Sequence, residues 1–316
     1  MRYRVLGNSG ISVSTVGLGC NNFGSRIGLS IAREVVDEAL RCGINLLDTA
    51  ESYGRGGGSE EILGEVLRGR RDKVVLATKF GDQFTDMRYD AGLGPKGSRT
   101  YIKHAVEQSL RRLRTDYIDL YQLHWPDPET PIEETLSALD ELVQSGLVRA
   151  IGYSNFSAEQ MAAASTRSKA CHAEFVSSQN HWSLLERGVE DQVVPMARQL
   201  GVAVLAYFPL EKGLLTGKVK RGQRPPEGSR LADQPGYITP SKLDKIEALD
   251  RWANDNGRTL LDLAIGGLAA TAGCTSVITG ATTPWQIAAN SAAGDWIPST
   301  RDLRAICTIA ELTDGK

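Results

Sequence analysis

The stretch IDLYQLHWPDPETPIEETLSALDELVQSGLVRAIGY, residues 118–153, contains one complete unit of the fold. Its two ends, Ile118 to His124 and Val148 to Tyr153, are short apolar runs typical of buried strands. Between them, five apolar residues recur at offsets 0, 4, 7, 10 and 11 and predict a helix with one apolar stripe. These residues are Ile132, Leu136, Leu139, Leu142 and Val143. A strand, a helix and a second strand in this order indicate parallel α/β structure.

Capping signals mark the ends of several helices. Residues 130–133 (TPIE) predict a capping box with proline at the first helical position, and Gly146 stands where that helix should stop. Residues 157–160 (SAEQ) and 283–286 (TPWQ) repeat the same pattern. We therefore expect helices to begin at these three places.

The alternation of strands and helices persists along nearly the whole chain. The predicted strands are Thr15 to Leu18, Ile44 to Asp48, Val74 to Lys79, Ile118 to His124, Val148 to Tyr153, Phe175 to Ser178, Val202 to Tyr207 and Ser276 to Thr279. Two doubly wound halves are the alternative, but residues 17–22 (GLGCNN) lack the third glycine of the dinucleotide-binding fingerprint. With no linker between the units, we expect one (β/α)8 TIM barrel forming a single domain over residues 1–316.

Two segments extend this barrel. Residues 3–5 and 12–13 flank the sequence Gly7-Asn8-Ser9-Gly10, which predicts an N-terminal β-hairpin that plugs the N-terminal end of the barrel. Residues 212–240 are rich in Gly, Pro and Arg, and we interpret them as a long loop over the catalytic face.

Composition and charge exclude several classes of protein. The chain has 316 residues, 41% of them hydrophobic and 23% charged, which is typical of a globular protein with a large core. Its 36 Lys and Arg against 38 Asp and Glu give a net charge of -2. Because no local basic patch stands out, we expect no nucleic-acid partner.

No segment is suited to a membrane or to secretion. The most apolar stretch, residues 260–274, contains Asp262 and falls short of the ~20 residues that span a bilayer. The first residues, MRYRV, lack the apolar region of a signal peptide. The cysteines are odd in number and form no C-x-x-C pair: Cys20, Cys42, Cys171, Cys274 and Cys307. We expect a reduced, cytoplasmic protein and predict no particular oligomeric state.

Polar side chains gather at the ends of the predicted strands. In a TIM barrel the carboxyl ends of the strands carry the active site. These ends are Asp48, Lys79, His124, Ser154 with Asn155, Gln179 and Tyr207. Taken singly, an Asp–Lys pair is a common structural ion pair and a histidine beside Trp125 is a common packing residue. Several such residues at one rim indicate catalysis.

Residues 48–54 (DTAESYG) begin a series of familiar motifs. The series continues with Thr78-Lys79, Leu123-His124, residues 152–156 (GYSNF), residues 206–210 (AYFPL) and residues 213–218 (GLLTGK). Together they resemble the aldo-keto reductase family, over the whole chain, and within it the branch of bacterial reductases and potassium-channel β-subunits. The resemblance implies a reductase of carbonyl compounds that uses a nicotinamide cofactor.

The resemblance also implies four catalytic roles. Tyr53 would donate a proton to the carbonyl oxygen, and a nearby cation, Lys79, would favour its phenolate. Asp48 would hold that ammonium in place. His124 would donate a hydrogen bond to the substrate oxygen.

Further residues are implied to bind the cofactor. By resemblance, Ser154, Asn155 and Gln179 bind the carboxamide of the cofactor, and Tyr207 stacks on the nicotinamide ring. The segment 208–218, which begins with Phe208, Pro209 and Leu210 and ends at Lys218, would follow the pyrophosphate. The residues implied to lie at a helix N-terminus suited to phosphate are Gly280, Thr282, Gln286 and Asn290. Gln286 is equally compatible with a capping role. Many members carry Lys or Arg near Gly280 to Gln286, and this chain has none there. Lys218 and Arg230 are the cations that could compensate, so we expect NADP(H), with NAD(H) as the alternative.

The substrate is expected to be a small carbonyl compound: an aldehyde, a ketone or a sugar-like carbonyl. We expect Asn21, Asn22, Phe23 and Trp125 to line its pocket, although Trp125 equally suits ordinary packing at the rim. Residues 54–59 (GRGGGS) resemble a phosphate loop but lack its Gly-Lys-Ser/Thr ending, so we interpret them as a mobile turn. His104, His172 and His181 have no metal-ligand spacing, and we expect no metal.

Two other functions are compatible with parts of the pattern. A regulatory subunit that senses the redox state of a nicotinamide cofactor would share the binding residues, as the channel β-subunits suggest. A Schiff-base aldolase would use Lys79, but pairing with Asp48 should keep that amine protonated.

Overall fold

The strands close into a barrel in the computed structural model, which describes residues 1–87, 89, 91–168 and 173–311. Neighbours pair in parallel from β3 to β9, and β10 completes the ring by pairing with both β9 and β3. The eight strands of these described residues are β3 (Val16–Gly19), β4 (Leu46–Asp48), β5 (Val75–Phe80), β6 (Ile118–Leu123), β7 (Val148–Ser154), β8 (Phe175–His181), β9 (Ala203–Tyr207) and β10 (Cys274–Gly280). Each overlaps its predicted range, and the predicted TIM barrel is confirmed.

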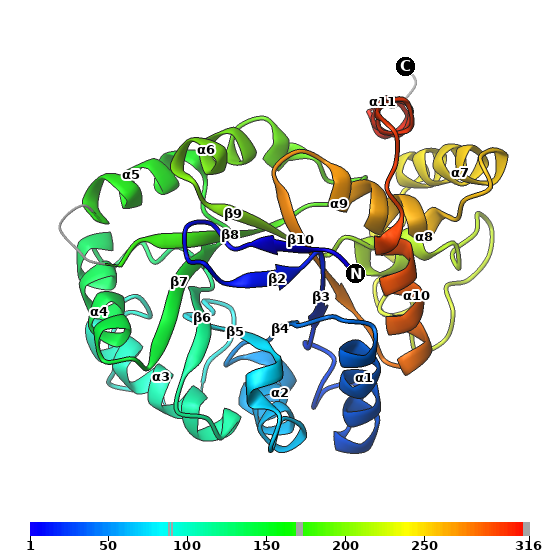
Figure 1. Ribbon diagram of the computed structural model, residues 1–316. Coiled ribbons are helices and arrows are strands. Elements are labelled where there is room, and N and C mark those ends of the chain that lie inside the picture. Colours follow the sequence, from blue (N-terminus) through cyan, green and yellow to red (C-terminus); the bar gives the residue numbers. More distant parts are fainter. Residues whose placement is uncertain (88, 90, 169–172, 312–316) are drawn as a thin grey trace.

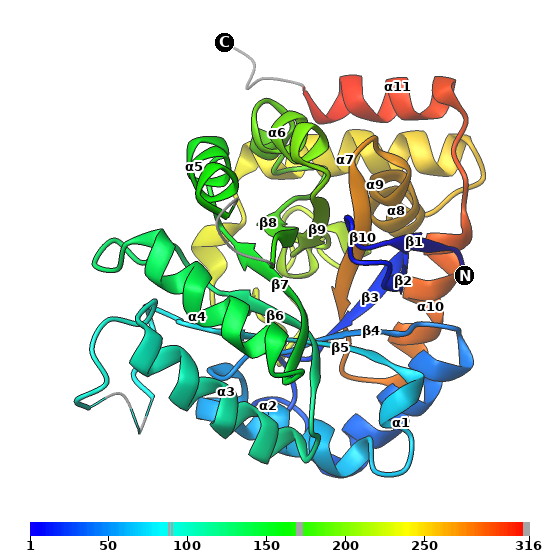
Figure 2. The ribbon, with the colours of Figure 1, turned by 60° about the vertical axis from the view of Figure 1, so that its left-hand side comes forward.

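Helices surround this ring (Figure 1). They are α1 (Leu29–Arg41), α2 (Tyr53–Val66), α3 (Arg99–Leu113), α4 (Ile132–Gln144), α5 (Ala158–Ser168), α6 (Val193–Leu200), α7 (Pro240–Asp255), α8 (Leu260–Asp262), α9 (Leu268–Ala270), α10 (Pro284–Asp295) and α11 (Thr300–Ala310). A π-helical turn, Leu263–Gly267, joins α8 to α9. Short 3-10 turns lie at Arg71–Lys73, Gly188–Glu190, Glu211–Thr216 and Pro235–Tyr237. Helices α7 and α11 lie side by side outside the ring (Figure 2).

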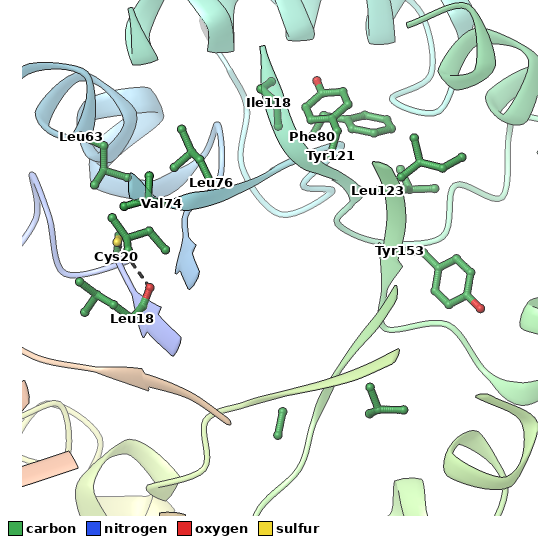
Figure 3. Packing of buried hydrophobic residues seen from close by; sticks show 14 of the residues in the cluster. Leu18, Cys20, Leu63, Val74, Leu76, Phe80, Ile118, Tyr121, Leu123 and Tyr153 are labelled. Atoms are coloured by element: carbon green, nitrogen blue, oxygen red, sulfur yellow. Dashed lines mark hydrogen bonds between the residues drawn. The ribbon is translucent and has the colours of Figure 1, made fainter. Parts of the chain in front are cut away.

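Alternation along each strand divides the core into two parts. Successive side chains of a strand point to opposite faces. In β5, Val75 and Ala77 belong to a cluster inside the barrel, whereas Leu76 packs outward with Leu63 of α2. Figure 3 shows this outer cluster, with Leu76 and Leu63 beside one another between strand and helix. The outer cluster is the larger of the two, because helices α1 to α6, α9 and α10 bury apolar residues in it. Helices α7, α8 and α11 pack together in a third cluster.

The N-terminal hairpin covers one end of the barrel. Strands β1 (Tyr3–Val5) and β2 (Ser12–Ser14) pair antiparallel and lie across the barrel in Figure 1. Leu6, Ile11 and Val13 join the cluster inside the ring, together with the first inward residues of the barrel strands. The predicted plug is therefore confirmed, and it leaves the other end of the barrel for the polar strand ends.

The structure corrects one predicted helix start. Helix α4 has Pro131 as its N-cap, and no side chain caps it. The hydroxyl of Thr130 instead donates to Asp127 Oδ2 at 2.8 Å. The same carboxylate oxygen accepts from the Gly97 amide, so Asp127 organises the loop before the helix. The stop at Gly146 is confirmed, with φ of 76°.

The other two predicted helix starts each have a side-chain cap. Ser157 and Gln160 form the full reciprocal box. Thr283 caps α10, with Pro284 at its start.

Residues 212–240 form the long connection that was predicted. Apart from two 3-10 turns they contain no regular element before α7. In the described part of the chain, no helix is long and apolar enough to cross a membrane.

Candidate active site

Asp48 and Lys79 end neighbouring strands and point into the barrel. Leu46 and Val75 face the interior, so the alternation of the strands turns Asp48, two residues on, and Lys79, four residues on, to the same side. The Lys79 ammonium donates to both carboxylate oxygens of Asp48, at 2.8 and 2.7 Å, and to the carbonyl of Thr49 at 3.0 Å. The predicted ion pair is present and buried.

Tyr53 and His124 lie against this pair. The Lys79 ammonium is 5.2 Å from the centroid of the Tyr53 ring. The rings of Tyr53 and His124 meet edge to face, with centroids 5.7 Å apart. The structure thus brings the four predicted catalytic residues to one place, from β4, β5, the start of α2 and the residue that follows β6.

Burial sets the protonation of these groups. It raises the pKa of the Tyr53 phenol, and the Lys79 ammonium lowers that pKa by less than burial raises it. The expected net depression of the tyrosine pKa is therefore not found. Burial also opposes charge on Lys79, but Asp48 and Tyr53 bring the pKa of the amine above its ordinary value. Burial and the Lys79 charge lower the pKa of His124 to about 3, so its imidazole is neutral at physiological pH.

A cavity of about 880 Å³ opens above these residues. Asp48, Tyr53 and His124 lie in its wall. So do the following residues predicted to bind cofactor or substrate: Ser154, Asn155, Gln179, Tyr207, Phe208, Pro209, Leu210, Lys218, Arg230, Gly280, Thr282, Gln286, Asn290, Asn21, Asn22 and Trp125. Phe23, in contrast, is fully buried in the outer core and does not reach the cavity, which corrects its predicted place.

Hydrogen bonds join the predicted cofactor residues to the catalytic pair. Gln179 Nε2 donates to Asp48 Oδ1 at 2.9 Å, and Ser154 Oγ donates to the carbonyl of Gln179 at 2.8 Å. The Tyr207 hydroxyl donates to Asn155 Oδ1 at 2.8 Å, while Asn155 Nδ2 donates to Ser154 Oγ at 3.0 Å. The polar rim is therefore one continuous network, which fixes each side chain before any ligand arrives.

The far end of the cavity fits a nicotinamide dinucleotide. The side-chain amide nitrogen of Asn290 is buried without a hydrogen-bond partner in the described structure. It lies on α10, whose N-terminal turn begins just after Gly280 and Thr282 at the cavity wall. A helix N-terminus and an unsatisfied donor together suit the phosphate and hydroxyl oxygens of a nucleotide.

Two cations also face this end. Arg230 Nη2 donates to the side-chain oxygens of Asn21 at 2.7 Å and Asn22 at 2.8 Å. The Lys218 ammonium lies 5.7 Å from the centroid of the Trp285 ring. Within the residues that the structure describes, neither cation bonds a carboxylate. Each therefore retains a charge that an anionic ligand can neutralise.

The structure also shows where two other predicted features lie. Gln286 Oε1 accepts from the amide of Thr282 at 2.7 Å, so its side chain caps the turn one residue before the predicted box. Residues 54–57 form a left-handed turn, and a Cβ at Gly54 would lie 2.4 Å from the Ser59 amide. The turn is thus present where predicted, and close packing explains this glycine.

The predicted histidines are also accounted for where the structure describes them. His181 meets Glu211 at 2.7 Å, and His104 lies 3.3 Å from Gln108. His172 lies outside the described residues. Among those that are described, no group of three potential ligands could hold a metal.

Sequence reasoning missed several functional candidates. Asp82, Phe84 and Trp285 line the cavity. Glu51, inside the quoted motif, is fully buried: it accepts from the Gly81 amide at 2.7 Å and the Tyr89 hydroxyl at 2.5 Å. The signal for Glu51 was a carboxylate inside the motif 48–54, three residues after the strand end at Asp48. No periodicity marks the exposed aromatic residues.

Comparisons with known proteins identify the family of this chain. Residues 15–310 match the model of the aldo/keto reductase family. The chain is 37% identical to the aldo-keto reductase YhdN of Bacillus subtilis, with 99% of this chain and 95% of that protein covered. It is 34% identical to the NADH-specific methylglyoxal reductase of Escherichia coli, with 91% and 92% covered. A probable voltage-gated potassium channel subunit beta of Arabidopsis thaliana is 33% identical, with 94% and 92% covered.

A solved structure extends the likeness to three dimensions. The holo form of the aldo-keto reductase AKR11C1 from Bacillus halodurans has 35% sequence identity and a TM-score of 0.81, with 98% of this chain and 97% of that one covered. The family match and the closed barrel together account for nearly the whole chain. The chain belongs to the aldo/keto reductase family of NAD(P)H-dependent oxidoreductases.

Proposed function

We propose that this protein reduces aldehyde or ketone carbonyls to alcohols with NADPH and that Tyr53 is the general acid. One observation carries the proposal: the Lys79 ammonium, held by Asp48 at 2.7 and 2.8 Å, lies 5.2 Å from the Tyr53 ring in the cavity wall. A phenol beside a fixed cation can release its proton to a developing alkoxide.

Each catalytic side chain has a separate role in the proposed reaction. When bound, the nicotinamide supplies the hydride that adds to the carbonyl carbon. The carbonyl oxygen gains negative charge and takes the proton of the Tyr53 phenol. Lys79 then stabilises the phenolate, and Asp48 keeps the ammonium in place. His124, which is neutral, donates an N–H to the same oxygen without adding a charge that would compete with Lys79.

An aldolase mechanism is less well supported by the same geometry. A Schiff base requires Lys79 as a free amine, whereas its two bonds to Asp48 and its raised pKa favour the ammonium. Failure of borohydride to trap a carbonyl compound on the protein is the expected result.

The hydrogen-bond network at the rim of the cavity supports the predicted cofactor residues. We infer that Ser154, Asn155 and Gln179 bind the carboxamide and that Tyr207 stacks on the nicotinamide ring. The segment 208–218, Arg230 and the start of α10 would hold the phosphates. NADPH is our choice over NADH because Lys218 and Arg230 have no carboxylate partner in the described chain, although one relative is named as NADH-specific.

Cofactor choice is tested by dissociation constants. Arg230→Ala should weaken NADPH binding more than NADH binding, since it removes a charge that pairs with phosphate. Fluorescence titration of both cofactors against the wild type and the variant measures this. An unchanged NADPH constant would exclude Arg230 from the phosphate site.

The proposed acid is tested by Tyr53→Phe. Steady-state NADPH oxidation with a panel of aldehydes should lose 10²-fold or more in kcat, on the order expected when a general acid is removed. The cofactor dissociation constant should stay within twofold, because the phenol hydroxyl is what changes. Unchanged turnover would rule out Tyr53 as the acid.

The likeness to the plant channel subunit supports a second candidate, a regulatory subunit that senses nicotinamide redox state. It predicts cofactor that co-purifies, slow turnover and a stable complex with a partner. Size-exclusion chromatography with cofactor fluorescence, beside a turnover assay, separates the two functions. Rapid multiple turnover would eliminate a purely sensing role.

We propose the cytoplasm as the site of action and a single domain as the working unit. Cys20, Cys42, Cys274 and Cys307 are free thiols in the structure, which supports a reducing compartment.

A further inference from the structure

One buried carboxylate beside the cavity has no part in the proposed reaction. Glu211 is 1% exposed, and it does not line the cavity as its neighbours Leu210 and Lys212 do. Its φ of 48° is left-handed, and so is the backbone of Phe208 (52°) and of Lys212 (57°). Residues with a Cβ keep such a backbone only where the surrounding structure holds it, and they cluster at ligand sites. The partners of Glu211 therefore indicate what this strained segment supports.

Three side chains donate hydrogen bonds to this carboxylate. The Ser183 hydroxyl donates to Glu211 Oε1 at 2.6 Å, and the Tyr237 hydroxyl donates to Oε2. His181 Nε2 lies 2.7 Å from Oε1. Burial opposes the charge of Glu211, but these three hydrogen bonds bring the pKa of its carboxyl below the ordinary value. Because an ionised carboxylate can only accept, Nε2 of His181 carries the hydrogen of its bond.

The bond to Glu211 holds the His181 ring against Tyr207. His181 and Tyr207 lie opposite each other on β8 and β9, and their rings are nearly parallel, with centroids 5.4 Å apart and planes at 14°. The Tyr207 hydroxyl is fixed separately, because it donates to Asn155 Oδ1 at 2.8 Å. The cavity-wall ring that is proposed to stack on the nicotinamide thus has a hydroxyl anchor and an aromatic support.

The other oxygen of Glu211 reaches the long connection formed by residues 212–240. Tyr237 belongs to this connection, and its ring lies 3.5 Å from the Lys242 ammonium. The same ammonium is 4.0 Å from Glu211 Oε2. Arg230, the cation proposed for the phosphates, lies seven residues before Tyr237 in the connection. One carboxylate therefore joins the support of Tyr207 to the segment that carries this cation.

We propose that Glu211 and His181 are positioning residues for the cofactor. They fix the nicotinamide end of the site through Tyr207, and the phosphate end through Tyr237 and the connection that carries Arg230. The inference rests on the proposed cofactor site, and it goes beyond that site by assigning a role to two residues outside the cavity wall. Because a site that is already ordered loses less freedom when a ligand binds, this pair acts on cofactor affinity and not on the chemical step.

The binding test uses variants that each remove one bond to Glu211. His181→Phe keeps a flat ring but loses the donor, and Tyr237→Phe loses only the hydroxyl. Each should raise the dissociation constant of NADPH about fivefold in a fluorescence titration, because the free site is less ordered. Tyr3→Phe is the matched control, since it removes a hydroxyl that donates to the Gly43 carbonyl at 2.7 Å at the opposite end of the barrel. The control should leave the constant within twofold.

Kinetics separate a positioning role from a general loss of structure. At saturating NADPH, both variants should keep kcat and the KM for an aldehyde within twofold, whereas the KM for NADPH should rise. A fall in kcat at saturation would overturn the positioning role.

A double variant tests whether the two arms act through the same carboxylate. His181→Phe/Tyr237→Phe should raise the dissociation constant of NADPH by clearly less than the product of the two single effects, because either loss already releases Glu211. Effects that multiply would mean that the arms are independent, and would overturn the coupling through Glu211.

Binding and turnover together distinguish a failure of this inference from a failure of the proposed reaction. If the wild type binds NADPH but reduces no carbonyl compound, and both variants bind NADPH more weakly, the reaction is wrong and the positioning role stands. If the wild type reduces aldehydes and both variants bind NADPH as tightly as it does, the positioning role is wrong and the reaction stands. A wild type that binds neither NADPH nor NADH would overturn both.

Discussion

Lys79 has no exposed surface, and its charge depends on a single carboxylate. Its ammonium makes two bonds to Asp48 and one to a backbone carbonyl. Removing one partner of a buried ion pair leaves a charge without compensation, and this usually costs more than the intact pair contributes.

We therefore expect Asp48→Asn to lower the free energy of unfolding by about 3–5 kcal/mol, as measured by urea denaturation. The double variant Asp48→Asn/Lys79→Met should recover much of that loss, because the uncompensated ammonium is gone. An equal loss in both variants would contradict this account and assign the effect to Asp48 packing alone.

His124 is expected to stay neutral over the range in which enzymes are usually assayed. Burial and Lys79 lower its pKa to about 3. Proton–carbon NMR of the imidazole Cε1–H, assigned with His124→Gln, should show no titration between pH 5 and 8. Any acid limb of kcat/KM in that range must then come from another group. A His124 midpoint near 6.5, the ordinary value for the free side chain, would contradict the expected neutrality.

At the scale of elements, Glu51 ties two strand ends together. Its amide donates to the carbonyl of Lys79 at 3.0 Å, and its carboxylate accepts from the Gly81 amide at 2.7 Å and from the Tyr101 hydroxyl at 3.0 Å. The loop from β4 to Tyr53 is thereby bound to the end of β5. Burial raises the pKa of this carboxyl to about 7, against these hydrogen bonds, which lower it.

The raised pKa makes stability depend on pH. Because the folded state holds the Glu51 proton more tightly than the unfolded chain, this group favours folding below pH 4.5, and its contribution is lost as pH rises from 4.5 to 7. The loss amounts to about 3 kcal/mol for the shift concerned. Urea denaturation of Glu51→Gln should show a smaller fall in stability over that interval. If the free energy of unfolding falls equally with pH in the wild type and the variant, Glu51 is not the cause of the pH dependence.

The hairpin offers a matched pair of glycines. Gly7 has φ of 52°, and a Cβ there would lie 2.4 Å from the carbonyl oxygen of Val176. Gly10 has φ of 71°, with nothing within 4 Å. Gly10→Ala should cost about 1–2 kcal/mol of stability from its backbone conformation alone. Gly7→Ala should cost clearly more by thermal or urea denaturation, since the backbone of β8 cannot move aside. Equal costs would mean that the hairpin does not press on the barrel.

Most strands were predictable because they are short, largely apolar runs, several of which lead into a polar residue such as Asp48, Lys79 or His124. The alternation of side chains from Leu46 and Val75 then turns Asp48 and Lys79 inward. The cap at Thr130 was not, because Asp127 competes for its hydroxyl through a loop whose path the sequence does not specify. The place of Phe84 in the cavity wall was not predicted for a similar reason, because a single aromatic residue in a loop is not part of any periodic pattern.

On the scale of the whole molecule, the two ends of the barrel have separate tasks. The hairpin fills one end with Leu6, Ile11 and Val13. At the other end, Arg230 links the loop that precedes α7 to Asn21 and Asn22 after β3. Sequence reasoning placed both segments from their composition. The bond from Arg230 to the two asparagines joins positions more than two hundred residues apart, and only the closed structure reveals it.

The pairing of β10 with β3 also constrains the order in which the barrel folds. These strands belong to opposite ends of the chain, so the ring closes only after the last strand has been made and the longest loop has been ordered. Asn22 Nδ2 donates to the carbonyl of Ala281 at 3.3 Å across that seam, whereas Asp48, Lys79 and His124 need only the first half of the barrel. During refolding, the catalytic pair can assemble early, and cofactor affinity should be the last property to return.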